Sequence, residues 1–108
     1  MDRDLQQKWQ RIEKLLLSAR SDLPEQNNPS PEFSALLTEF AEFICHNELG
    51  LALEAIAAAG ELVETGGRFW HYLQHAAEEM ELHAQAKEFN FRFVQAAAIG
   101  LEQAQNKT

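Results

Sequence analysis

The side chains best suited to chemistry in this sequence are four histidines and a single cysteine. His71 and His75 are one helical turn apart, and Glu78 and Glu79 follow one turn later, so one helix face could offer three ligands to a zinc ion. However, no second segment supplies the Glu-x-x-His pairs that complete metal sites in helical bundles. We therefore interpret these histidines as half-exposed polar residues, and we expect neither a metal nor another cofactor.

Two further patterns could suggest catalysis. Cys45 is followed by His46, but adjacent residues on a helix point about 100° apart and cannot form a hydrogen-bonded nucleophile and base. We expect Cys45 to be a small buried thiol near a turn. Two pairs of glutamates could be read as a catalytic acid and base: Glu39 with Glu42, and Glu61 with Glu64. However, nothing nearby would make the two pKa values within either pair differ. The sequence thus predicts a protein that is not an enzyme.

The chain has 108 residues, of which 45% are hydrophobic and 24% charged. This length and composition predict a single folded domain over residues 1–108. There is no apolar run of transmembrane length and no signal-peptide block after the charged start of the sequence. A lone cysteine fits a reducing compartment. We therefore expect a soluble cytoplasmic protein.

Apolar residues recur at helical spacing along the whole chain, and no segment alternates as a strand would. We expect helices over about 2–20, from Pro31 with Ser30 as its N-cap, and from Asn47, which we interpret as the cap of the third helix. A polar, proline-bearing loop occupies 21–30. A break near 82–86 should divide the segment after Arg68 into two helices. These elements predict an all-α fold, a small bundle of four to five helices with a short helix-turn-helix hairpin at its centre.

Most of these helices show one apolar stripe. In the first helix we expect the stripe to be buried, and its members are Leu5, Trp9, Ile12, Leu16 and Ala19. The last helix shows two stripes on opposite sides, one with Phe91, Val94, Ala98 and Leu101 and the other with Phe89, Phe93, Ala96 and Gly100. Such a helix is either central to the core or part of an interface with a partner.

Charge is distributed unevenly along the chain. Between Arg20 and Arg68 there is no lysine or arginine, yet there are nine acidic residues, so this block holds more than the whole net charge of −8. The block could simply be a solvated face, or it could accelerate association with a cationic partner through long-range attraction. Net negative charge argues against nucleic acid and against an anionic membrane surface.

The string Phe-Ile-Cys-His-Asn-Glu-Leu-Gly-Leu-Ala-Leu-Glu, from Phe43 to Glu54, lies inside this acidic block. It resembles the helix–turn–helix signature of MafI-type immunity proteins of bacterial polymorphic toxin systems. The Ala-rich, Met-containing segment 76–82 is similar to a later part of that signature, so the resemblance covers about residues 33–82. It implies an all-helical protein that neutralises a toxin.

The residues of this string also have structural roles. We expect Asn47 to cap the third helix with Glu48 in its first turn, and Gly50 to allow close approach of the second helix. Leu49 and Leu53 should return to the core. We therefore interpret these five residues as a structural motif.

Two functional hypotheses follow. In the first, the chain is an immunity-type inhibitor whose acidic surface covers the basic cleft of a toxin, plausibly a nuclease. The residues in contact with the toxin would be acidic side chains and one exposed aromatic anchor: Glu39, Glu42, Glu54, Glu61, Glu64 and Trp70. Phe69 and Tyr72 are alternatives to Trp70 as the aromatic anchor. In the second, the chain is a self-associating helical module or adaptor without a toxin partner, and the extra stripe of the last helix forms a homodimer face.

Overall fold

The computed structural model describes the backbone of residues 2–106 and the side chains of residues 3–99. Over this range the chain forms five α-helices and no strand, which confirms the predicted all-α fold. The helices are α1 (Asp2–Asp22), α2 (Pro31–Cys45), α3 (Leu49–Glu61), α4 (Gly67–Glu79) and α5 (His83–Asn106).

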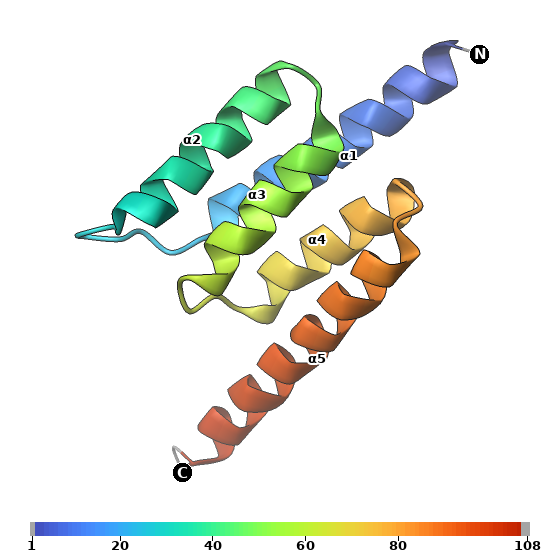
Figure 1. Ribbon diagram of the computed structural model, residues 1–108. Coiled ribbons are helices and arrows are strands. Elements are labelled where there is room, and N and C mark those ends of the chain that lie inside the picture. Colours follow the sequence, from blue (N-terminus) through green and yellow to red (C-terminus); the bar gives the residue numbers. More distant parts are fainter. Residues whose placement is uncertain (1, 107–108) are drawn as a thin grey trace.

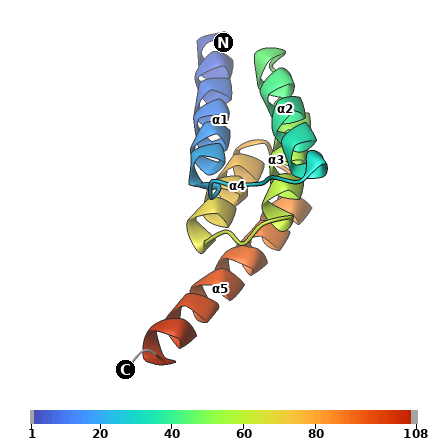
Figure 2. The same cartoon turned by 90° about the vertical axis from the view of Figure 1, so that its left-hand side faces the viewer.

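The five helices form two hairpins, which α1 joins. In one hairpin α2 packs against α3, and in the other α4 packs against α5. Helix α1 lies along α4 and also contacts α3, so it bridges the two hairpins, as Figures 1 and 2 show. The core fills the space between α1, α3 and α4, and its largest fully buried side chains are Ile12, Leu16, Leu53, Ile56, Phe69 and Leu73.

The beginning of α2 follows the sequence prediction. The Ser30 hydroxyl accepts a hydrogen bond from the backbone N–H of Phe33 at 3.1 Å, and Pro31 occupies the first helical position. Proline suits this position because its missing N–H has no partner in the first turn. Phe33 and Phe40 are buried on the inner side of α2. The local signals of cap and proline thus fix where the acidic hairpin begins.

The turn between α2 and α3 differs from the prediction. Asn47 has a φ of 58°, and its backbone N–H donates to the carbonyl of Ile44, while the Glu48 N–H donates to the carbonyl of Phe43. This is the Schellman stop of α2, in which a left-handed residue closes the helix end. Asn47 therefore ends α2 instead of capping α3, because asparagine tolerates positive φ better than most residues.

The turn between α4 and α5 repeats this geometry 34 residues later. Glu81 has a φ of 60°, its N–H donates to the carbonyl of Glu78, and the Leu82 N–H donates to the carbonyl of Ala77. The predicted break is thus confirmed, but it lies at residues 80–82, slightly before the expected range of 82–86. Glutamate is not a residue that usually marks a left-handed helix end, so the sequence did not show that the break lies at residues 80–82.

Several other expectations about packing are corrected. Leu49 and Leu53 are buried as predicted, and so are Ile12, Leu16 and Ala19 of the first stripe. Leu5 and Trp9 of that stripe are exposed, because the N-terminal end of α1 projects beyond the other helices. Glu64 does not share a helix face with Glu54 and Glu61, since α3 ends at Glu61.

The two glycines of α3 have different surroundings. A Cβ at Gly50 would meet no atom within 4 Å, so this glycine does not serve close packing, contrary to the prediction. A Cβ at Gly60 would overlap the ring of Phe69, which is fully buried on α4. Gly60 is therefore the glycine that allows close packing. The absence of a side chain there lets α3 of one hairpin touch α4 of the other.

We predict that Gly60→Ala lowers the free energy of unfolding by about 1–2 kcal/mol, because overpacking a core outweighs the gain in helix propensity. Gly50→Ala is the matched control and should be neutral or stabilising by about 0.5 kcal/mol. Urea denaturation of the two variants measures both values. If Gly60→Ala were as stable as the control variant, the Phe69 ring would not pack closely against α3.

Candidate interaction surface

The histidines of α4 do not assemble a metal site. The His71 and His75 rings meet edge to face with centroids 4.4 Å apart, and the other face of His71 stacks on Phe93 at 4.6 Å. Glu78 accepts a hydrogen bond from Gln74 at 2.8 Å. Among the described residues, no group of three or more His, Cys, Asp or Glu side chains could hold a metal ion.

Cys45 is the last residue of α2, and His46 follows as its C-cap. Both side chains are exposed, which corrects the expectation that the thiol would be buried. The thiol is exposed because the Schellman stop begins here and the chain turns away before another helix can cover the helix end.

The aromatic anchors expected on α4 are not exposed. Trp70 is only 6% exposed, and its ring meets that of Phe69 edge to face and stacks on that of Phe89. The Arg92 guanidinium lies 5.3 Å from the centre of the Trp70 ring and covers it further. The expectation that Trp70 is an exposed anchor is therefore corrected, and the Phe69 ring is buried as well. Helix α5 buries both rings, and the sequence did not show which face of α4 this helix would cover.

The predicted acidic residues separate into two groups. Glu39, Glu42 and Glu54 are exposed on the α2–α3 hairpin, and none of them forms an ion pair within the described part of the chain. Glu61, at the end of α3, is paired with Arg92 of α5, and Glu64 is exposed in the linker before α4. The structure thus brings together three of the five predicted glutamates.

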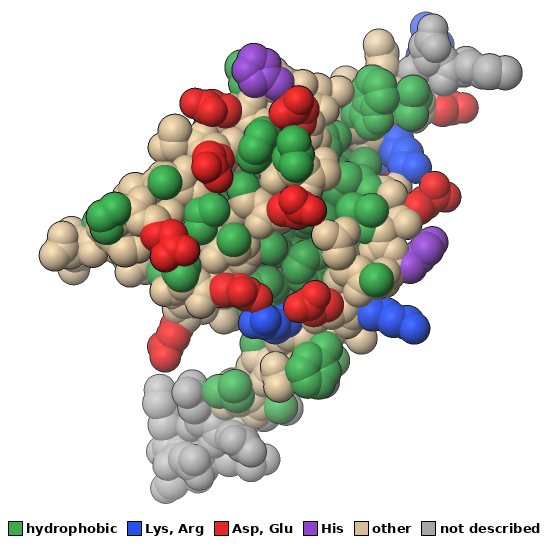
Figure 3. Space-filling model, viewed as in Figure 1, with side chains coloured by type: hydrophobic (Ala, Val, Ile, Leu, Met, Phe, Trp, Pro, Cys, Tyr) green, Lys and Arg blue, Asp and Glu red, His purple; other side chains and the backbone are tan. Residues whose placement is uncertain are grey.

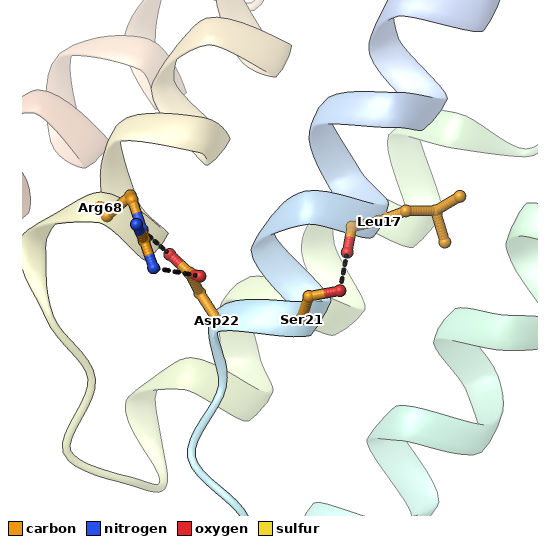
Figure 4. A network of polar contacts seen from close by, with 4 residues as sticks. All are labelled: Leu17, Ser21, Asp22 and Arg68. Carbon is orange, nitrogen blue, oxygen red and sulfur yellow. Dashed lines mark hydrogen bonds and ion pairs between the residues drawn. The ribbon is translucent and has the colours of Figure 1, made fainter.

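Other acidic residues serve to join helices. Asp22, at the end of α1, accepts two hydrogen bonds from Arg68, at 2.7 Å and 3.0 Å, as Figure 4 shows. Hydrogen bonding to Asp22, together with its charge, raises the pKa of Arg68. A bidentate pair of this kind fixes direction as well as distance. It holds the end of α1 at the beginning of α4.

A shallow groove of about 290 Å³ runs between α2 and α3 on the outer side of the hairpin. Apolar side chains form most of its lining, and Glu39 and Glu54 stand beside them: the lining comprises Leu36, Glu39, Phe43, Leu51, Glu54 and Ala55. Leu51 is 45% exposed, so part of this apolar lining is in contact with solvent. We call this feature the hairpin groove.

Figure 3 shows the face that carries this hairpin. Acidic side chains are scattered over the region of α2 and α3 with hydrophobic side chains between them, whereas lysine and arginine lie toward α1, α4 and α5. The surface is therefore both acidic and partly apolar. That combination suits a partner that presents basic residues around an apolar side chain.

The spacing of the leucines at the beginning of α3 is a sequence signal for the groove. Leu49 and Leu51 lie about 200° apart around a helix, so both cannot point into the same core. Leu49 and Leu53 are the buried pair, and Leu51 must then face outward. Leu36 of α2 is half-buried and lines the same groove.

Basic residues gather on a different side of the molecule. Helix α1 carries five of the nine lysines and arginines of the chain. A hollow of about 560 Å³ lies between α1 and α4, lined by Arg11, Lys14, Tyr72, His75 and their neighbours. The Arg11 side chain also pairs with Glu79 across this hollow at 3.4 Å. This hollow therefore carries side chains of both charges, whereas the charged side chains that line the hairpin groove are both glutamates.

Comparisons with protein-family models, with curated proteins and with solved structures find no match to this chain. Within the described residues, no helix combines the length and the apolar character required to cross a bilayer.

We predict that zinc leaves the melting temperature of the protein unchanged. Binding to His71 and His75 would have to draw the rings away from each other and from Phe93, and no third ligand is in place. A thermal melt with and without excess zinc tests this. A saturable stabilisation above about 2 kcal/mol would contradict it, because specific binding stabilises the native state by mass action.

Proposed function

We propose that this chain is an immunity-type inhibitor that binds and neutralises a cognate bacterial toxin with a basic surface. The observation that carries the proposal is the hairpin groove, in which glutamates that form no ion pair with any described residue stand beside exposed apolar side chains. This groove lies inside the segment that resembles the signature of MafI-type immunity proteins.

Charge and apolar surface would contribute differently to such binding. A segment of nine acidic and no basic residues attracts a cationic protein over distances near the Debye length, about 8 Å at 0.15 M salt, and so raises the association rate. The apolar floor of the groove slows dissociation, because an inserted side chain is removed from water. Glu39 and Glu54 beside the floor can then pair with basic residues around that side chain.

Inhibition on this account needs no chemistry from the chain. A toxin that acts on nucleic acid must present positive charge to its substrate. An acidic hairpin seated over that basic cleft excludes the substrate by occupying the same surface. The cytoplasm, where the producing cell would have to be protected, is the location that this proposal implies.

The test begins by recovering the partner from the native bacterium by pull-down and then measuring the binding kinetics. We predict that the double variant Glu39→Lys, Glu54→Lys slows association by at least about tenfold, because it removes attraction and adds repulsion at the groove. Both side chains are exposed, so each change should cost only about 0.5 kcal/mol of folding stability. The association rate of the unchanged protein should also fall as salt increases.

The control is Asp4→Lys with Glu78→Lys, which alters the net charge equally but lies outside α2 and α3. This control should retain most of the association rate. Equal loss in both double variants would mean that only the overall charge matters. No loss in either variant, with no dependence on salt, would show that the acidic segment is merely a solvated face.

A further inference from the structure

Helix α5 extends well beyond the helix that it covers. It has 24 residues and is therefore about 36 Å long, whereas α4 has only 13. Its first half packs on α4 through Ala86 and Phe89, and the Phe93 ring reaches Gly67 at the beginning of α4. Beyond this point α5 leaves the body of the molecule, as both views show, and it contributes to the longest dimension of 54 Å.

The projecting part of α5 is unusually apolar. Residues 93–101 contain no charged side chain, in a protein in which 24% of residues are charged. Phe91 is 59% exposed, Val94 55% and Ile99 54%. The stripe containing Phe91 therefore faces solvent, while the stripe containing Phe89 faces the core; Gly100 and Leu101 lie outside the described side chains. A helix that is apolar on all sides is normally buried.

We propose that a second copy of this chain covers α5, with the two α5 helices packed antiparallel. The seam is formed by positions 91, 94 and 98, whose spacing of three and four residues is that of a coiled-coil seam. Ala97 and Ala98 are exposed and small, so a second helix can approach closely. This interface is independent of the hairpin groove and of the function proposed above.

The sequence of the seam is complementary to itself when two copies run in opposite directions. A register that sets the large Phe91 of one copy opposite the small Ala98 of the other does so on both sides of the two-fold axis, so a large side chain faces a small one twice. No equivalent pairing arises in a parallel arrangement in register, where each residue meets its own copy.

Charge also favours the antiparallel arrangement of two copies. Each chain carries a net charge of −8, concentrated between residues 20 and 68. The part of α5 with described side chains contains Lys87, Glu88 and Arg92, so its own charge is slightly positive. Antiparallel pairing places the two bodies at opposite ends of the seam, which keeps the acidic hairpins apart and opposes the two helix dipoles.

Sedimentation velocity of the full chain over a range of concentrations tests the proposal. A contact confined to two helices is small, so we expect a reversible dimer with a dissociation constant of about 1–100 µM. Phe91→Glu should weaken dimerisation by at least about 100-fold while leaving the helical circular dichroism unchanged, because the side chain is exposed. Leu17→Glu changes an exposed hydrophobic side chain on α1 instead of α5 and should leave the dimer intact.

The register is tested by exchanging side-chain size. Ala98→Phe should weaken the dimer, because it sets two large rings opposite each other, and Ala98→Phe combined with Phe91→Ala should restore it. In a Cys45→Ser background, Val94→Cys should form a disulfide between copies, whereas Ala98→Cys should not, because position 94 lies near the two-fold axis. A chain that stays monomeric up to several hundred micromolar would overturn the proposal. Cross-linking of Ala98→Cys as efficiently as Val94→Cys would overturn the antiparallel arrangement.

Discussion

The packing of α1 against both hairpins is the interaction on which the rest of the structure depends. The α2–α3 and α4–α5 hairpins each contain two helices, and neither pair alone encloses a core of the size seen here. A glycine on α3 lets the ring of Phe69 on α4 lie against the helix backbone, so the two hairpins touch directly at this point. Helix α1 then buries Ile12 and Leu16 in the angle between them, and the Asp22–Arg68 pair fixes its end.

This arrangement determines which surfaces remain free. Because α3 turns its buried side toward α1 and α4, its outer side and that of α2 are left to form the hairpin groove. Because α5 covers only the length of α4, its second half projects. The acidic, partly apolar surface and the uncharged helix therefore lie on different parts of the molecule. The first suits a basic partner, and the second suits another copy of the chain.

The sequence predicted the helices, the α2–α3 hairpin and most of the core, but not how the other helices pack. Ser30 and Pro31 placed the beginning of α2 well because they act locally, whereas Asn47 ends α2 instead of capping α3. The role of Gly50 was assigned wrongly, because close approach depends on a neighbouring helix that local pattern does not specify. Trp70 was assigned to the surface for the same reason: only the tertiary position of α5 decides that this ring is buried. Of the predicted contact residues, Glu39, Glu42 and Glu54 remain together on one surface.

The central claim is that a basic partner binds the outer side of the α2–α3 hairpin. Hydrogen–deuterium exchange of the complex with the recovered partner, compared with the free chain, locates the contact directly. The account predicts slower amide exchange in Leu36–Phe43 and Leu51–Ala55, with little change along α1. Slower exchange confined to α1 and α4, with the hairpin unaffected, would contradict it.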